Sequence, residues 1–367
     1  MKRLTLLPVA ILVASLLSTA SFCTEPAPET SAESAPAGLL GETYPLAAPV
    51  SFPAALLHWL DSVTYLRGAG MTAGKTIEAH RQAYIDFLGV PAEEEQQLLE
   101  AYRSVRVGFA SGASGNRDDL TRAFFEAETI DEALEQAKPL LSERDLTRLS
   151  ESVRHFEPGY RRIWNDGKTV RAFLNRAESS KQGDKLAEFL AGVAKFYGVD
   201  PDMEPRPRLV LVPVPAGAGT HAQAIEEFLL VEVRPGDGLR DQVAPIVHEN
   251  AHLLFRRMGQ ERIKALEAAA VAHGPMGQAT WLHLNEALPT AIGQGVAQVN
   301  FRIEGWSLQM RWYDVEVVDV FAKKIFPKVK RALSTGRPLD PALIEEFVEI
   351  YKSSVAPRTA GAAATPR

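Results

Sequence analysis

Cysteine is almost absent from this chain, since Cys23 is the only one among 367 residues. No intrachain disulfide can form, so the folded state must be stabilised by its hydrophobic core. An excess of basic residues is also missing, because 40 Lys and Arg stand against 46 Asp and Glu, for a formal net charge of −6. Binding to nucleic acid needs clustered Lys and Arg to neutralise phosphates, so nucleic acid is not an expected partner.

The chain also lacks a long hydrophobic run, and this absence argues against a transmembrane span in the mature chain. The apolar run from Leu4 to Leu17 is shorter than the roughly 20 residues that cross a bilayer. It follows two basic residues and ends in Ser18-Thr19-Ala20, a pattern typical of a secretory signal peptide over residues 1–20. The sequence thus predicts an exported protein, periplasmic or secreted.

Cys23 offers a second interpretation of this N-terminus. Its position after the apolar run resembles the lipid-attachment cysteine of bacterial lipoproteins, which would make residues 1–22 the signal and Cys23 a membrane anchor. Phe22 stands against lipidation, because a small residue is expected there, and cleavage after Ala20 is the simpler alternative. In either case, the Pro-, Ala-, Ser- and Glu-rich composition predicts a flexible tether within residues 21–45.

Helical periodicity dominates the remainder of the chain. Residues 46–200 form a helical N-terminal region, with helices expected at 53–66, 76–87, 92–106, 130–137, 143–155 and 185–197. Residues 201–352 are expected to hold two short strands, at 209–212 and 227–233, and further helices at 315–333 and 341–351. The tail, 353–367, is predicted to be disordered. We therefore expect a predominantly helical α+β fold with a small sheet.

The motif that carries chemistry is His-Glu-Asn-Ala-His at residues 248–252. Apolar residues recur at three- and four-residue spacing from Val243 to Met258, which predicts a helix. At about 100° per residue, His248 and His252 project from nearly the same helix face, while Glu249 is rotated by about a quarter turn. Two imidazoles can then reach one metal ion, and the carboxylate can face a water on it.

The helix is expected to begin at Asp241, as its N-cap, and to stop at Gly259, with Arg256 and Arg257 in its last turn. Pro245 is discordant, because it removes a backbone donor in the early turns.

The residue types in this motif suit zinc hydrolysis. Neutral imidazole is a good zinc donor, and a catalytic site uses three protein ligands, with water in the fourth position. Zinc lowers the pKa of that water to about 7, and a neighbouring carboxylate passes its proton to the leaving amine. His248 and His252 are one ligand short of such a site.

A second segment, Trp281 to Leu288, supplies a candidate for the missing ligand, since it contains Asn285-Glu286. Together the two segments resemble the gluzincins, the zinc peptidases that include thermolysin. The resemblance covers roughly residues 205 to 295. It implies a zincin-like catalytic domain over 201–352, with Zn²⁺ held by His248, His252 and Glu286 and with Glu249 as general base.

One departure from the gluzincin pattern is the spacing, because 33 residues separate His252 from Glu286. An additional helix over residues 260–273, which are alanine-rich, can absorb the excess. Other third ligands remain open at this point, namely Glu261, Glu267, His273 and His283. The metzincin alternative fails, since Phe255 and Met258 stand where that pattern needs Gly and His.

Two further residues are candidates for stabilising the oxyanion. His283 lies three residues before Glu286 and shares its helix face, although a packed histidine is the commoner role. Tyr313 is the other candidate, on the resemblance to enzymes that use a tyrosine, and its alternative is a core aromatic. By the same analogy, the strand at 227–233 is expected to be the sheet edge that pairs with an extended substrate.

The predicted function is therefore an exported zinc metallopeptidase acting on a peptide or protein substrate. The alternative is an envelope protein with a zincin-like site that captures a peptide or protein partner without turnover. Glu249 disfavours the alternative, because binding alone does not require a base.

Overall fold

The structure is a computed structural model that describes residues 38–40, 46–48, 50–64, 93–110, 119–216 and 221–355. The predicted signal peptide, Cys23, the helix expected at 76–87 and most of the predicted tether and tail lie outside the described residues. Gly38–Leu40, near the end of the predicted tether, form a strand. The last helix continues to Ser354, so the start of the predicted tail at residue 353 is two residues too early.

A five-stranded sheet takes its strands from both halves of the chain, in the order β1-β2-β3-β5-β4. Neighbouring pairs β2–β3 and β3–β5 are parallel, whereas β1–β2 and β4–β5 are antiparallel. The two strands predicted from their apolar runs are confirmed as β3 and β5, which are buried over nearly their whole length. The strands are β1 (Gly38–Leu40), β2 (Leu46–Ala48), β3 (Arg208–Pro213), β4 (Ala222–Ile225) and β5 (Phe228–Val233).

The prediction that 227–233 forms the sheet edge is wrong. β5 lies between β3 and β4, and the edge strand is β4, which pairs antiparallel with β5. A tight turn at Glu226 and Glu227 joins the two strands, with Glu226 in the left-handed region at φ 50°. Two of the four residues of β4 are alanines, which are depleted in strands, and only Ile225 is β-branched. The sequence of β4 therefore carries little strand signal, and the strand forms because it pairs with β5.

A buried carboxylate fixes the start of β4. Glu232 of β5 is fully buried, and its Oε2 accepts a hydrogen bond from the backbone N–H of His221 at 2.8 Å. Its other oxygen pairs with His58 of the helix α1 (Phe52–Val63), which is also buried. Burying a carboxylate is costly unless it is paired and hydrogen-bonded, so this arrangement ties the edge strand to the helix α1.

Helices make up most of the fold, which confirms the predominantly helical α+β class. Those before β3 are α1 (Phe52–Val63), α3 (Glu93–Ala110), α4 (Asp119–Glu126), α5 (Ile130–Ala137), α6 (Glu143–Trp164), α7 (Lys168–Ser179) and α8 (Gln182–Tyr197). Those after β5 are α9 (Leu239–Arg257), α10 (Gln260–Val271), α11 (Pro275–Thr290), a π-helix (Ala291–Ala297), α12 (Gln298–Phe301), α13 (Glu316–Thr335) and α14 (Pro341–Ser354). The short helices α4 and α7 were not predicted.

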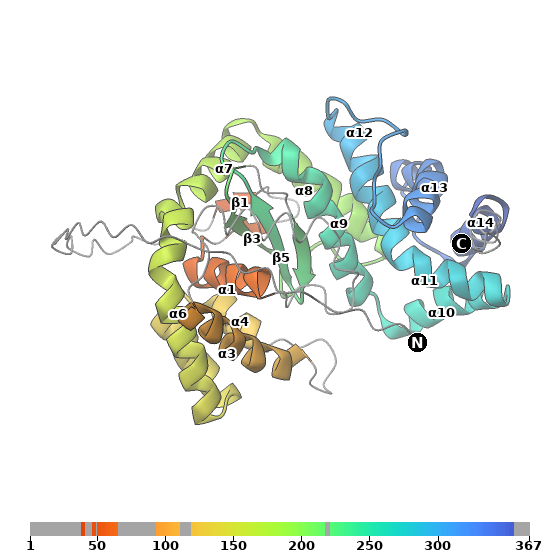
Figure 1. The fold of residues 1–367 in the computed structure, drawn as a ribbon. Coiled ribbons are helices and arrows are strands. Elements are labelled where there is room, and N and C mark those ends of the chain that lie inside the picture. The colour runs from red at the N-terminus through yellow and green to blue at the C-terminus, as the bar shows by residue number, and fades with distance from the viewer. Residues whose placement is uncertain are drawn as a thin grey trace, which may run out of the picture. The chain divides into compact units, whose positions relative to one another are not determined.

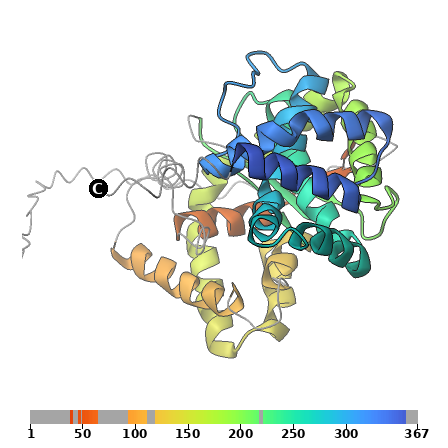
Figure 2. The ribbon, with the colours of Figure 1, turned by 90° about the vertical axis from the view of Figure 1, so that its right-hand side faces the viewer.

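The sheet and the C-terminal helices meet at α9. This helix packs against β4 and β5 and against α8 and α11 (Figure 1). Beyond α9, α11 contacts α10, α13 and α14, and α14 also contacts α10 and α13. These four helices, in teal to blue, gather together (Figure 2). None of the described helices combines the length and apolar character that a membrane span requires. The residues 248–252 therefore lie on a helix that connects the sheet to the helical cluster.

Candidate metal centre

The helix α9 positions the two histidines of the motif. It begins one residue after Gly238 and ends at Arg257, so Asp241 is not its N-cap as predicted. Asp241 is instead the third residue of the helix, where its Oδ2 accepts a hydrogen bond from the Gly238 N–H at 2.7 Å. A carboxylate in the first turn of a helix satisfies a free N–H and is stabilised by the helix dipole. Pro245 lies inside the helix, before the motif.

Three donor atoms converge between α9 and α11. The Nε2 atoms of His248 and His252 are 3.1 Å apart, and Glu286 Oε2 lies 3.5 Å from the first and 3.4 Å from the second. His248 is buried, and the other two are half-buried. These residues form a cluster that can hold a metal ion, and it is the set of three that the sequence favoured.

The additional helix predicted between the two segments is confirmed as α10. Because α10 fills the interval, α11 can return along α9 in the opposite direction. The ring centroids of Phe255 in α9 and Trp281 in α11 are 5.9 Å apart. Earlier in α9 and later in α11, His252 contacts Glu286. The long spacing between the second histidine and the glutamate is therefore compatible with one shared site.

The other candidate ligands lie elsewhere. His283 Nδ1 is 2.9 Å from the Ala279 carbonyl and 3.0 Å from the Tyr351 hydroxyl of α14, so this histidine is packed against α14. Packing against α14 speaks against its predicted role at the oxyanion. The Nδ1 atom of His273 contacts Lys352 at 3.0 Å. Glu261 and Glu267 are exposed on α10, as expected for solvated charges.

Glu249 is held against the edge of the sheet. Its Oε2 accepts a hydrogen bond from the backbone N–H of Ala224, in β4, at 2.8 Å. The carboxylate is near enough to the cluster for its charge to raise the pKa values of His248 and Tyr313. Glu249 is thus beside the three donors without being one of them, in agreement with the quarter-turn offset expected on a helix.

Tyr313 reaches the same cluster from the loop between α12 and α13. Its hydroxyl donates a hydrogen bond to Glu286 Oε2 at 3.0 Å. Its ring lies nearly parallel to the His248 ring, with the two ring centroids 6.2 Å apart. Burial raises the pKa of the Tyr313 hydroxyl, and the nearby Glu286 carboxylate raises it further. The phenol is therefore a neutral hydrogen-bond donor at neutral pH.

Asp319, which the sequence did not single out, holds the Tyr313 loop. Its Oδ1 accepts hydrogen bonds from the backbone N–H groups of Trp312 at 2.6 Å and Tyr313 at 3.3 Å, and its Oδ2 accepts one from Lys323 at 2.8 Å. In the sequence it reads as an ordinary acidic residue in the first turn of a helix, so no local signal separates it from the others.

His248 and Glu286 form an ion pair when His248 is protonated. Burial lowers the pKa of His248, but the hydrogen bond to Glu286 and the charge of Glu249 outweigh burial and raise it overall. For Glu286, burial acts to raise the pKa, but the hydrogen bonds with His248 and His252 hold it well below its usual range. His248 therefore holds its proton, and Glu286 its negative charge, more strongly than either would in the unfolded chain.

This ion pair predicts how the stability of the metal-free protein depends on pH. The contribution of His248 is fully present below its unfolded pKa of 6.5 and is lost as the pH rises through its raised folded value. The contribution of Glu286 is present above 4.5 and is lost as the pH falls through its lowered value. The ion pair should therefore contribute most to the free energy of unfolding between pH 4.5 and pH 6.5. Urea unfolding of the chelator-treated protein measures this contribution.

The matched control is Glu286→Gln, which removes the charge but keeps the size. The difference in unfolding free energy between wild type and Glu286→Gln should shrink as the pH rises through the raised pKa of His248. An equal difference at pH 5.5 and pH 9 (about one unit below and more than two above the ordinary histidine pKa) would contradict the prediction.

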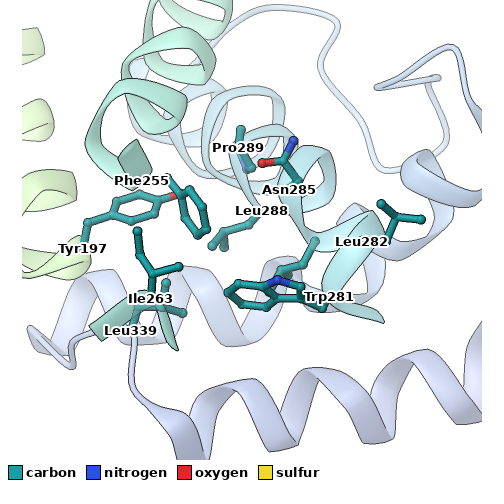
Figure 3. Close-up of a pocket in the computed structure, with 10 residues that line it drawn as sticks. Tyr197, Phe255, Ile263, Trp281, Leu282, Asn285, Leu288, Pro289 and Leu339 are labelled. Atoms are coloured by element: carbon teal, nitrogen blue, oxygen red, sulfur yellow. The ribbon is translucent and has the colours of Figure 1, made fainter. Parts of the chain in front are cut away.

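An apolar cavity of about 280 Å³ adjoins the two helices that carry the cluster (Figure 3). Phe255 borders it one turn beyond His252, and Asn285 borders it next to Glu286. The full lining comprises Tyr197, Phe255, Ile263, Trp281, Leu282, Leu284, Asn285, Leu288, Pro289 and Leu339.

Comparison of the chain with family models, curated proteins and solved structures gives no significant match.

Proposed function

We propose that this protein is an exported zinc-dependent peptidase with a gluzincin-like site in a zincin-like domain. The observation that carries the proposal is the spacing of the three donor atoms, 3.1 to 3.5 Å. Two ligands of one tetrahedral zinc ion, each about 2.0–2.1 Å from the metal, are about 3.3 Å apart. The donor set also fits, since two imidazole nitrogens and one carboxylate leave a fourth position open for catalysis.

The arrangement of the donors adds to this fit. Two neutral imidazoles and an ionised carboxylate direct lone pairs at one another across little more than 3 Å, which is unfavourable unless a cation or proton lies between them. A zinc ion there would polarise a peptide carbonyl and lower the pKa of a water molecule. His248, His252 and Glu286 are the residues that would hold it.

In the proposed mechanism, Glu249 is the general base. Its carboxylate takes a proton from the attacking water and delivers it to the nitrogen of the leaving amine. The hydrogen bond from the Ala224 N–H holds one carboxylate oxygen at the edge of the sheet, which leaves the other to act in proton transfer. The position of Glu249 beside the donors favours hydrolysis over simple capture of a peptide, which needs no base.

Tyr313 is the proposed donor to the oxyanion. Its hydroxyl lies against Glu286, and a small rotation of the side chain would release it to a carbonyl oxygen bound nearby. A preorganised donor of this kind stabilises the charge that develops in the transition state. The edge strand β4, with Ala224 next to Glu249, is the proposed place where an extended peptide backbone pairs.

A zinc determination combined with digestion of a peptide library tests the proposal. The purified protein should contain one zinc ion per chain after dialysis, and it should cleave a subset of the peptides in a reaction that chelation stops and added zinc restores. Tightly bound zinc without cleavage of any peptide would favour the capture of a peptide or protein partner. Absence of zinc binding would contradict both functions.

A further inference from the structure

The π-helix Ala291–Ala297, which directly follows α11, brings its backbone against the first metal-site histidine. π-helical turns are rare and occur frequently at functional sites. A Cβ atom on Gly293 would lie 2.6 Å from the Ala244 carbonyl oxygen and 3.2 Å from the backbone nitrogen of His248. Only glycine allows the two helices this close an approach, and the approach places the next residue, Gln294, beside the His248 ring.

The side chains of His248 and Gln294 complement each other. His248 Nδ1 is buried and has no hydrogen-bond partner among the other described residues, and the same is true of Gln294 Oε1. The Gln294 side chain is near enough to the imidazole to raise its pKa. Two side chains that lie close together therefore each carry a buried polar atom, one ring nitrogen and one amide oxygen, without a hydrogen-bond partner among the other described residues.

The backbone around Gln294 is fixed by contacts with residues outside α9. The carbonyl oxygen of Gln294 accepts a hydrogen bond from Trp306 Nε1 at 2.6 Å. The neighbouring Gly295 lies so close to Phe326 that a Cβ atom would be 2.6 Å from that ring. Both contacts restrict movement of the π-helix, so the Gln294 side chain is presented to His248 from a rigid support.

The chemistry of a metal-binding histidine explains this pairing. A histidine that binds a metal through Nε2 carries its proton on Nδ1, and that N–H needs an acceptor when it is buried. We propose that Gln294 is the positioning residue of the metal centre: its Oε1 accepts the Nδ1–H of His248 and keeps Nε2 unprotonated toward His252 and Glu286. This inference rests on the zinc site of the proposed function but not on peptide hydrolysis.

Zinc affinity, measured by competition with a chromophoric chelator, tests the role of Gln294. Gln294→Met, which keeps the length of the side chain but removes the acceptor, should weaken zinc binding by about 10- to 100-fold, the usual effect of losing such a partner. Gln294→Glu keeps an acceptor and should bind zinc more tightly than Gln294→Met by a similar factor. Gln298→Met, one turn further along, is the matched control and should leave affinity unchanged.

A second measurement starts from the wild-type protein and reads the proposed hydrogen bond directly. Nitrogen-15 NMR of the zinc-loaded protein should show the Nδ1–H of His248 as a slowly exchanging proton, and Gln294→Met should lose it. Thr290→Val tests a rival acceptor, since Thr290 Oγ1 is also buried and has no hydrogen-bond partner among the other described residues.

The outcomes separate this inference from the function on which it rests. Zinc affinity of Gln294→Met within about threefold of wild type, well short of the expected 10- to 100-fold, would overturn the role of Gln294. A rapidly exchanging Nδ1–H in the wild type, or a loss confined to Thr290→Val, would overturn it as well. Failure of the wild type to bind zinc would overturn the zinc site and this inference together. Tight zinc binding without peptide cleavage would leave the role of Gln294 intact.

Discussion

Glu249→Gln is expected to abolish peptide hydrolysis while leaving the zinc content near that of the wild type. The amide keeps the shape of the side chain and can still accept the hydrogen bond from Ala224 N–H, but it cannot take a proton from water. General-base catalysis contributes about 10²- to 10⁴-fold to a rate, so kcat should fall by at least about 10²-fold. Metal analysis and cleavage of the best library peptide measure the two effects.

The control for this substitution is Glu261→Gln. Glu261 is exposed on α10 and pairs with Lys264 on the same helix, so the same chemical change there should alter neither zinc content nor hydrolysis. Wild-type activity in a zinc-replete Glu249→Gln protein would rule out Glu249 as the base.

Glu286→Ala is expected to weaken zinc binding more than any other single carboxylate substitution. It removes one of three ligands and also the partner that holds Tyr313. The loss should exceed the roughly 10- to 100-fold that follows removal of a residue that only supports a ligand. Competition with a chelator of known affinity measures it.

Glu267→Ala is the matched control, because Glu267 is an exposed glutamate on the helix between the two metal-site segments. It should bind zinc like the wild type. If Glu286→Ala kept full affinity, the third ligand would have to be another residue, and the cluster of His248, His252 and Glu286 would not be the zinc site.

The part of the site that lies within one helix was predictable from local sequence. His248, Glu249 and His252 are set by the geometry of a single helical turn, and the apolar residues around them indicate that helix without further information. The same holds for β3 and β5, whose apolar runs are long enough to identify buried strands.

Contacts between distant segments decided the remainder. Glu286 was indicated only by a resemblance, and its meeting with His252 depends on α10 turning the chain back along α9. His283 lies three residues before Glu286 on α11, yet its side chain contacts Tyr351 of α14, whereas Glu286 contacts α9. A spacing of three residues along one helix does not show which neighbouring helix each side chain meets.

Local sequence also gives no indication of three further features of the site, namely the edge strand β4, Asp319 and Gln294. β4 is a strand because β5 pairs with it, and two of its four residues are alanines, which are depleted in strands. Asp319 contacts the loop that carries Tyr313, and Gln294 lies in a π-helix. No residue pattern in the sequence predicts either arrangement. The sequence by itself determined the helix that bears His248, Glu249 and His252. Tertiary structure decided the third donor, the phenol and the supporting residues, because each is brought to α9 by packing between segments far apart in the chain.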